Sequence, residues 1–154
     1  MKTRPGPAVF VQNRVGRKGV PATSSFERWV QAALRDRHQG RRQVNIALLD
    51  ESEGRDLNHR FRGKNYATNV LSFACEPLPR ERPVLLGDLA ICAPVVAREA
   101  AEQGKPLRHH YAHLTVHGVL HLLGFDHESA ADAARMEDIE RRILARLNIP
   151  DPYV

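Results

Sequence analysis

Apolar positions fall into short blocks along the chain, and their spacing predicts both strands and helices. Residues 9–11 are β-branched or aromatic, which is typical of a strand. Residues 26–34 have apolar side chains at helical intervals, which predicts an amphipathic helix that continues to about His38 and ends at Gly40. The tetrapeptide at 24–27 (SSFE) has the spacing of a capping box, so we expect it to cap this helix.

The rest of the chain continues this mixture of strands and helices. Further strands are predicted at 44–49, 70–73 and 84–92, the last one interrupted by Gly87 and Asp88. Further helices are predicted at 51–62, 94–103, 107–123 and 129–147. Because the order is not a regular alternation of strand and helix, the pattern predicts an α+β fold, with a small mixed sheet packed with helices in a single domain over residues 1–154.

The composition is that of an ordinary globular protein, with 42% hydrophobic and 27% charged residues. The longest apolar stretches are much shorter than the roughly 20 residues that cross a bilayer. The first residues are basic but lack the apolar core of a signal peptide. We therefore expect a cytoplasmic protein without a membrane partner.

The chain is basic, with a formal net charge of +5 at pH 7. Only four of its 23 basic residues are lysines, which leaves 19 arginines. The planar guanidinium group binds phosphate well, so a nucleic-acid partner is worth considering. An arginine-rich proteome would produce the same bias, and charge alone does not decide between the two explanations.

Two cysteines, Cys75 and Cys92, lack the C-x-x-C spacing of zinc or redox sites. We expect two buried thiols in a reducing compartment and assign neither a functional role.

Three histidines near residue 120 predict a metal site. His117 and His121 are four residues apart, so on a helix they lie on one face and can bind the same ion. Gly124 allows a left-handed turn that brings His127 back over that face as a third ligand. Three imidazoles with one open position are typical of a catalytic zinc site, and we expect one Zn²⁺ per chain on the C-terminal-half helix and the turn that follows it.

His113 lies four residues before His117 and competes for the same pairing. His113 and His121 are about 12 Å apart along the axis, too far to share an ion. The downstream glycine and histidine favour the pair of His117 and His121. His113 is then a core histidine, the slightly favoured interpretation, or a residue that supports a ligand or faces the substrate.

The spacing of these residues equals that of the metalloprotease motif H-E-x-x-H-x-x-G-x-x-H, but the catalytic glutamate is replaced by Gly118. Glycine inside a helix costs roughly 1 kcal/mol relative to alanine, which indicates a need for room, and substrate backbone above the metal is one explanation. The replacement disfavours peptide hydrolysis through a glutamate base.

The stretch from His113 to His127 closely resembles the signature of the YbeY family of bacterial endoribonucleases and rRNA maturation factors. Residues 57–64, 68–73 and 87–91 resemble further segments of that family, in the same order. Where family members often have two prolines and a tyrosine, this chain has Ala67, Ala74 and Phe125, a difference that concerns loop rigidity rather than the metal site.

The resemblance implies a zinc-dependent, single-strand-specific endoribonuclease acting in 16S rRNA 3′-end maturation and 70S ribosome quality control. It implies that His117, His121 and His127 bind the metal and that Arg62 is catalytic, with single-stranded RNA and the ribosome as partners. Protein partners are not implied.

Zinc lowers the pKa of bound water to around 7, so no dedicated protein base is needed. Either the resulting hydroxide or the RNA 2′-OH could then attack phosphorus. Arg62 would stabilise charge on the phosphate. Asp126 either orients a histidine or shapes a turn, and Asp88 is expected to be structural.

Two alternative functions remain open. The protein could be another zinc hydrolase, such as a protease, or a non-catalytic ribosome-associated zinc protein.

Overall fold

The computed structural model describes residues 6–35, 37, 41–76, 78, 80 and 83–154, and every predicted strand and helix is present in it, most within two residues of the predicted bounds. In chain order, the elements are β1 (Ala8–Asn13), α1 (Thr23–Leu34), β2 (Arg42–Leu49), α2 (Glu51–Arg62), β3 (Val70–Ala74), β4 (Val84–Cys92), α3 (Ala93–Gln103), α4 (Leu107–Leu122) and α5 (Ala130–Arg146). Within the described residues, none of these helices is long and apolar enough to cross a membrane.

The four strands form one sheet in the order β1-β2-β4-β3. Strands β1, β2 and β4 are parallel to one another, whereas β3 pairs antiparallel with β4 at the edge. The sheet is therefore mixed, which confirms the prediction of an α+β fold with a small mixed sheet.

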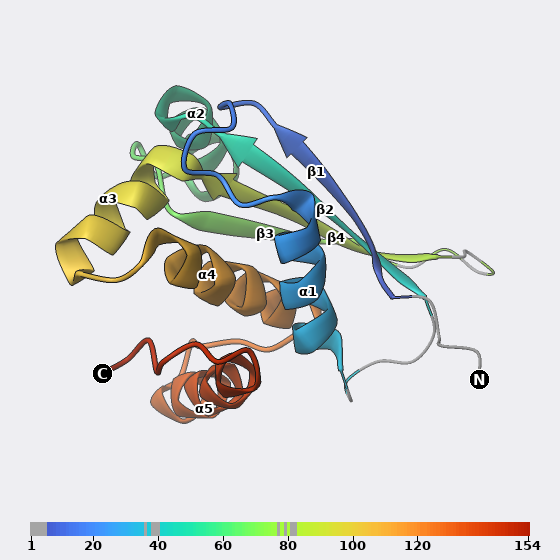
Figure 1. Cartoon of the computed structure of the whole chain (residues 1–154). Helices are drawn as coiled ribbons and strands as arrows, with labels where there is room; N and C mark the ends of the chain where they lie inside the picture. The colour runs from blue at the N-terminus through green and yellow to red at the C-terminus, as the bar shows by residue number, and fades with distance from the viewer. Residues whose placement is uncertain (1–5, 36, 38–40, 77, 79, 81–82) are drawn as a thin grey trace.

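Helices α1 and α4 cover one face of the sheet, and α5 packs on the outside of α4 (Figure 1). On β2, the side chains that face these helices are Val44, Ile46 and Leu48, and each is at most 1% exposed. Because α4 lies between the sheet and α5, it is buried on several sides, including the positions of Val116 and Leu120. The helix with the predicted metal ligands is thus packed on both sides, against the sheet and against α5.

The opposite face of the sheet is covered only in part. Helix α2 packs against one end of it, where Leu57 joins the small apolar cluster of Leu49, Leu71 and Ala90. Beyond α2, polar and half-buried side chains such as Asn45 remain at the surface. This second face therefore has room for a ligand or partner.

The start and end of α1 differ from the prediction. Ala22 occupies its N-cap position and no side chain caps the helix, so the predicted capping box is wrong. Helix α1 ends at Leu34, earlier than predicted, and both His38 and Gly40 lie outside the described residues.

Strand β4 continues through Gly87 and Asp88, which both pair with residues of β2, but its register shifts just before them, since Gln43 pairs with Leu85 and Val44 with Gly87. The predicted interruption is therefore a β-bulge at Leu86 within a continuous strand. The side chain of Asp88 accepts a hydrogen bond from the Asn45 amide at 3.0 Å, which fits the structural role expected for it.

The two cysteines are both free, but only Cys92 is buried. Burial raises the pKa of the Cys92 thiol. Cys75 is exposed just after β3, so the prediction of two buried thiols is wrong for this residue.

Candidate metal centre

Helix α4 and the turn that follows it carry the three histidines. The ring centroids of His117 and His121 are 4.6 Å apart, as expected for neighbours one helical turn apart. After the helix, Gly124 has a φ of 97°, a left-handed conformation that strongly favours glycine. The backbone N–H groups of Gly124 and Phe125 donate to the carbonyls of His121 and Leu120, both at 3.0 Å, which is the hydrogen-bond pattern of a Schellman motif.

This turn returns His127 to the helix face. Its ring centroid lies 5.6 Å from that of His117 and 4.9 Å from that of His121. Asp126 shapes the returning segment, since its carboxylate accepts hydrogen bonds from the backbone N–H groups of His127 and Glu128. Of the two roles considered for Asp126, the geometry supports that of a turn residue.

The three rings present their nitrogen atoms to a common point. One nitrogen from each ring lies within 4.8 Å of the other two. The Nε2 atoms of His117 and His121 are 3.1 Å apart. Two ligands of a tetrahedral zinc ion, each at about 2.0–2.1 Å from it, would be about 3.3 Å apart, so the spacing fits such an ion closely.

A buried carboxylate sets the orientation of His117. Glu140 of α5 is 0% exposed, and its Oε1 atom lies 2.5 Å from Nδ1 of His117. Because a carboxylate accepts hydrogen bonds, Nδ1 carries the hydrogen and Nε2 keeps its lone pair for a ligand. A carboxylate behind a ligating histidine is a common device for holding the ring and raising its basicity.

Glu140 stays ionised despite its burial. Burial by itself raises the pKa of a carboxyl group, but hydrogen bonds with His113, His117 and Tyr153 outweigh that effect and lower the pKa of Glu140 to about 2. The hydroxyl of Tyr153 donates to Oε2 of this carboxylate. Burial, and to a smaller extent the nearby Glu140 carboxylate, raises the pKa of Tyr153, so its hydroxyl stays protonated.

His113 belongs to the same network. Its Nε2 atom lies 3.2 Å from the Tyr153 hydroxyl and 3.5 Å from Oε2 of Glu140. The geometry therefore favours a supporting role for His113 over the simple core histidine that was slightly preferred. It contacts Glu140 and Tyr153 and does not join the cluster of three ligands.

His121 is held in the neutral form that binds metals. Burial is the main reason that its pKa is lowered to about 4, and the nearby rings of His117 and His127 lower it further. A neutral imidazole has a lone pair available for a metal ion at neutral pH.

The three histidines border a hollow of about 560 Å³. Its other walls are residues 68–74, which lead into and form β3, and the end of α2 with Phe61 and Arg62. Arg62 is the last residue of α2, which ends there because Gly63 adopts a left-handed φ of 69°. The predicted catalytic arginine and the predicted ligands thus border one hollow although they are far apart in the sequence.

Gly118 faces the sheet and not the hollow. A Cβ atom at this position would lie 2.8 Å from a methyl group of Leu89 and 3.3 Å from the Ser72 hydroxyl oxygen. The expectation that Gly118 makes room for substrate is therefore wrong, because the room is taken by β3 and β4. If a glutamate stood here, as in the protease motif, its side chain would run into the sheet.

Sequence reasoning missed Glu140 and Tyr153. Glu140 had a recognisable signal, since it lies on the apolar face of α5, four residues after Met136 and three before Ile143, where a charge needs a buried partner. Tyr153 had none, because its contact with Glu140 depends on how the segment after α5 folds back (Figure 1).

Comparison with known proteins shows to which family the chain is similar. A family model described as "Endoribonuclease YbeY" matches residues 11–148. Proteins named "Endoribonuclease YbeY" from Xanthomonas campestris (strain B100) and Stenotrophomonas maltophilia (strain K279a) are each 57% identical to this chain over 150 residues, covering 94% of this chain and 92% of theirs.

A solution structure of a protein from Thermotoga maritima shares the fold. It superimposes with a TM-score of 0.57, at 21% identity, over 91% of each chain. At this identity the likeness concerns the fold alone.

Proposed function

The chain belongs to the YbeY family of endoribonucleases, and from this we propose that it is a zinc-dependent enzyme that cleaves single-stranded RNA. The proposed enzyme is one domain over residues 1–154, with one Zn²⁺ bound by His117, His121 and His127 and with Arg62 as its catalytic residue. The observation that carries the proposal is the convergence of three imidazole nitrogens beside an open hollow.

The donor set suits a catalytic zinc ion. Three histidines offer three ligand atoms, and among the described residues no further histidine, cysteine or carboxylate joins the group. A structural zinc site normally closes all four positions with protein ligands, so a three-ligand site beside a hollow favours catalysis. When bound, zinc would act as a Lewis acid toward phosphoryl oxygens and lower the pKa of water to near 7.

The residues of this chain supply binding and orientation. Glu140 holds the hydrogen of His117 on Nδ1, which turns the Nε2 lone pair toward the other two rings. Arg62, at the rim of the same hollow, offers planar N–H donors for the oxygens of a phosphodiester. As negative charge develops on those oxygens during cleavage, a positioned guanidinium stabilises it.

The biological substrate is proposed from the family. We expect the 3′ end of 16S rRNA to be cut during maturation in the cytoplasm, and defective 70S ribosomes to be targets during quality control. The 19 arginines among 23 basic residues are compatible with such a polyanionic partner.

The decisive experiment combines metal analysis with cleavage assays. Purified protein should contain one zinc per chain and cut a labelled single-stranded RNA, but neither the same RNA annealed to its complement nor casein. A strong chelator should abolish cutting, and added zinc should restore it. Full cleavage by metal-free protein would overturn the zinc mechanism, whereas digestion of casein would favour the protease alternative.

Two variants test the assigned residues. His121→Ala should lose zinc and cleavage, whereas His109→Ala on the same helix should keep both, since His109 does not border the hollow. Arg62→Glu should keep its zinc and lose cleavage by roughly 100-fold or more, the usual size of a lost oxyanion contact. Arg55→Glu, an equal charge change on the same helix away from the hollow, is its control.

A further inference from the structure

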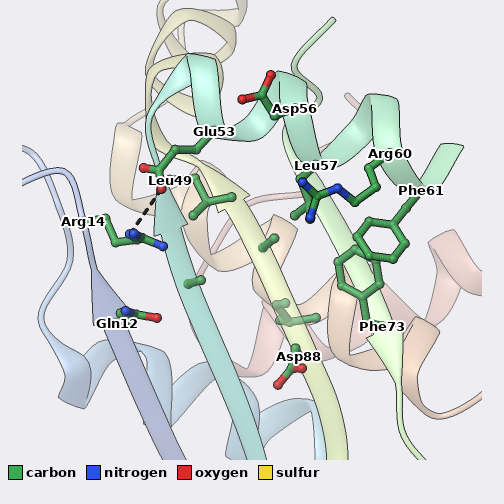
Figure 2. Close-up of a pocket in the computed structure, with 13 residues that line it drawn as sticks. Gln12, Arg14, Leu49, Glu53, Asp56, Leu57, Arg60, Phe61, Phe73 and Asp88 are labelled. Carbon is green, nitrogen blue, oxygen red and sulfur yellow. Dashed lines mark ion pairs between the residues drawn. The ribbon is translucent and has the colours of Figure 1, made fainter. Parts of the chain in front are cut away.

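A second hollow, of about 750 Å³, lies on the sheet face that α1 and α4 leave uncovered. Its floor is apolar and comes from the middle strands, with Ala47 and Leu49 of β2 and Ala90 of β4. Figure 2 shows α2 along its upper edge, with the ion pair of Arg14 and Glu53 on the side opposite Phe61 and Phe73. Nothing in the proposed zinc chemistry uses this space.

Two phenylalanines join this second hollow to the metal centre. Phe61 of α2 and Phe73 of β3 border both hollows. Their rings meet edge to face, with centroids 5.1 Å apart and an angle of 65° between the planes (Figure 2). Any ligand that extends from the histidines into the second hollow must therefore pass this aromatic pair.

Phe61 is unusually exposed for its type, at 59%. It lies between Arg60 and Arg62, of which Arg60 borders the second hollow and Arg62 borders the metal centre. An exposed ring with arginines beside it in the sequence is typical of sites that bind single-stranded nucleic acid, because the ring can stack on a base while the guanidinium groups bind nearby phosphates.

The charges of the second hollow indicate which part of a nucleotide can enter it. Asp56 and Asp88 border it and would repel a phosphate, and Glu53 is already paired with Arg14 at 3.2 Å. A neutral base with an apolar face suits the floor, and its amino groups could donate to carboxylate oxygens at the edge. The phosphates of a strand would then stay on the side of the aromatic pair where Arg62 and the metal centre lie.

We propose that Phe61 and Phe73 form a stacking site for the nucleobase next to the phosphate held by Arg62. This inference rests on the proposed function, since it assumes that single-stranded RNA is the substrate. A base can use the site only when it is unstacked from its own helix, which gives a physical reason for cleavage of single strands. The stacking contact itself does not select a sequence, because every base has a stacking face.

The substitution Phe61→Trp tests the site by fluorescence. The chain has one tryptophan, Trp29, which is only 2% exposed and is shielded from any ligand. A short single-stranded RNA should quench the emission of the new indole, and the same oligonucleotide with an abasic nucleotide beside the cleaved bond should not. Phe10→Trp is the matched control, because Phe10 is 60% exposed but borders neither hollow, and its emission should not change.

Binding and cleavage provide the second measurement. Phe61→Ala should raise the Kd for the intact oligonucleotide by about 5-fold to 150-fold, the effect of losing one stacked base, and Phe61→Trp should restore it. With the abasic oligonucleotide, Phe61→Ala and the unchanged protein should bind equally. Zinc content should be the same in all of these proteins.

The two proposals fail in different ways. If the unchanged protein cuts RNA but neither Phe61→Ala nor the abasic nucleotide has an effect, the stacking site is wrong and the proposed function stands. If the zinc-loaded protein neither binds nor cuts single-stranded RNA, the proposed function fails and the stacking site with it.

Discussion

The Nδ1 atom of His117 lies 2.5 Å from Oε1 of Glu140, a carboxylate with no exposed surface. This contact joins α4 to α5 across 23 residues of sequence and fixes which nitrogen of the ring is available to a metal. The site thus consists of three rings around a common point and, next to His117, the hydrogen-bonded group of Glu140, His113 and Tyr153.

The first prediction concerns that carboxylate. Glu140→Gln keeps the size of the side chain but removes the charge that holds His117, so zinc affinity should fall by about 10-fold to 100-fold. Competition with a chromogenic chelator measures this change. The control is Asp138→Asn, because Asp138 is exposed on the same helix and pairs with Arg142. Equal zinc affinity in the two variants would contradict the positioning role.

A spectroscopic measurement separates positioning from simple packing. In metal-free protein, ¹⁵N spectra should show His117 with its hydrogen on Nδ1, and Glu140→Gln should disturb that preference. If Glu140 contributes only packing, His117 in the Glu140→Gln protein should still carry its hydrogen on Nδ1.

The second prediction concerns Tyr153. The segment after α5 is anchored by an ion pair between Arg141 and Asp151 at 2.9 Å, and Tyr153 then reaches Glu140. Tyr153→Phe removes only the hydroxyl, so it should lower the free energy of unfolding by about 1–2 kcal/mol and weaken zinc binding less than Glu140→Gln does. Chemical denaturation and chelator competition measure the two effects. Tyr66→Phe, at an exposed position, should change neither.

The third prediction concerns Gly118. Alanine at this position should improve helix propensity by roughly 1 kcal/mol, but its methyl group would crowd Leu89, and overpacking typically costs about 1–3 kcal/mol. We expect a small net loss for Gly118→Ala. Gly118→Glu, which recreates the protease motif, should lose several kcal/mol because a carboxylate would be forced against the sheet. Urea denaturation checks both, and a fully stable Gly118→Glu with peptidase activity would contradict this account.

The fourth prediction concerns helix caps. Ser129 accepts a hydrogen bond from the N–H of Asp132 at 3.0 Å at the start of α5, and Asp50 accepts one from Glu53 at 2.8 Å at the start of α2. Ser129→Ala and Asp50→Ala should each lower the free energy of unfolding by about 1 kcal/mol. Ser24→Ala should have almost no effect, since no side chain caps α1. If Ser24→Ala lowered the free energy of unfolding as much as Ser129→Ala does, the predicted capping box at the start of α1 would be correct after all.

Local sequence determined the elements and the shape of the metal-binding turn. The spacing of His117 and His121, and the left-handed Gly124 that returns His127, depend only on residues near in sequence, so helix geometry and glycine chemistry sufficed to predict that these rings converge. The bounds of α2 and α3 were predicted closely for the same reason.

Tertiary structure alone decided what stands behind and beside those rings. Glu140 reaches His117 from another helix, the sheet occupies the space in front of Gly118, and Phe61 of α2 meets Phe73 of the edge strand β3. These contacts join residues far apart in the chain, and periodicity within one element does not specify which distant element will pack against it. The order of the strands and the packing of α4 between sheet and α5 supply that information.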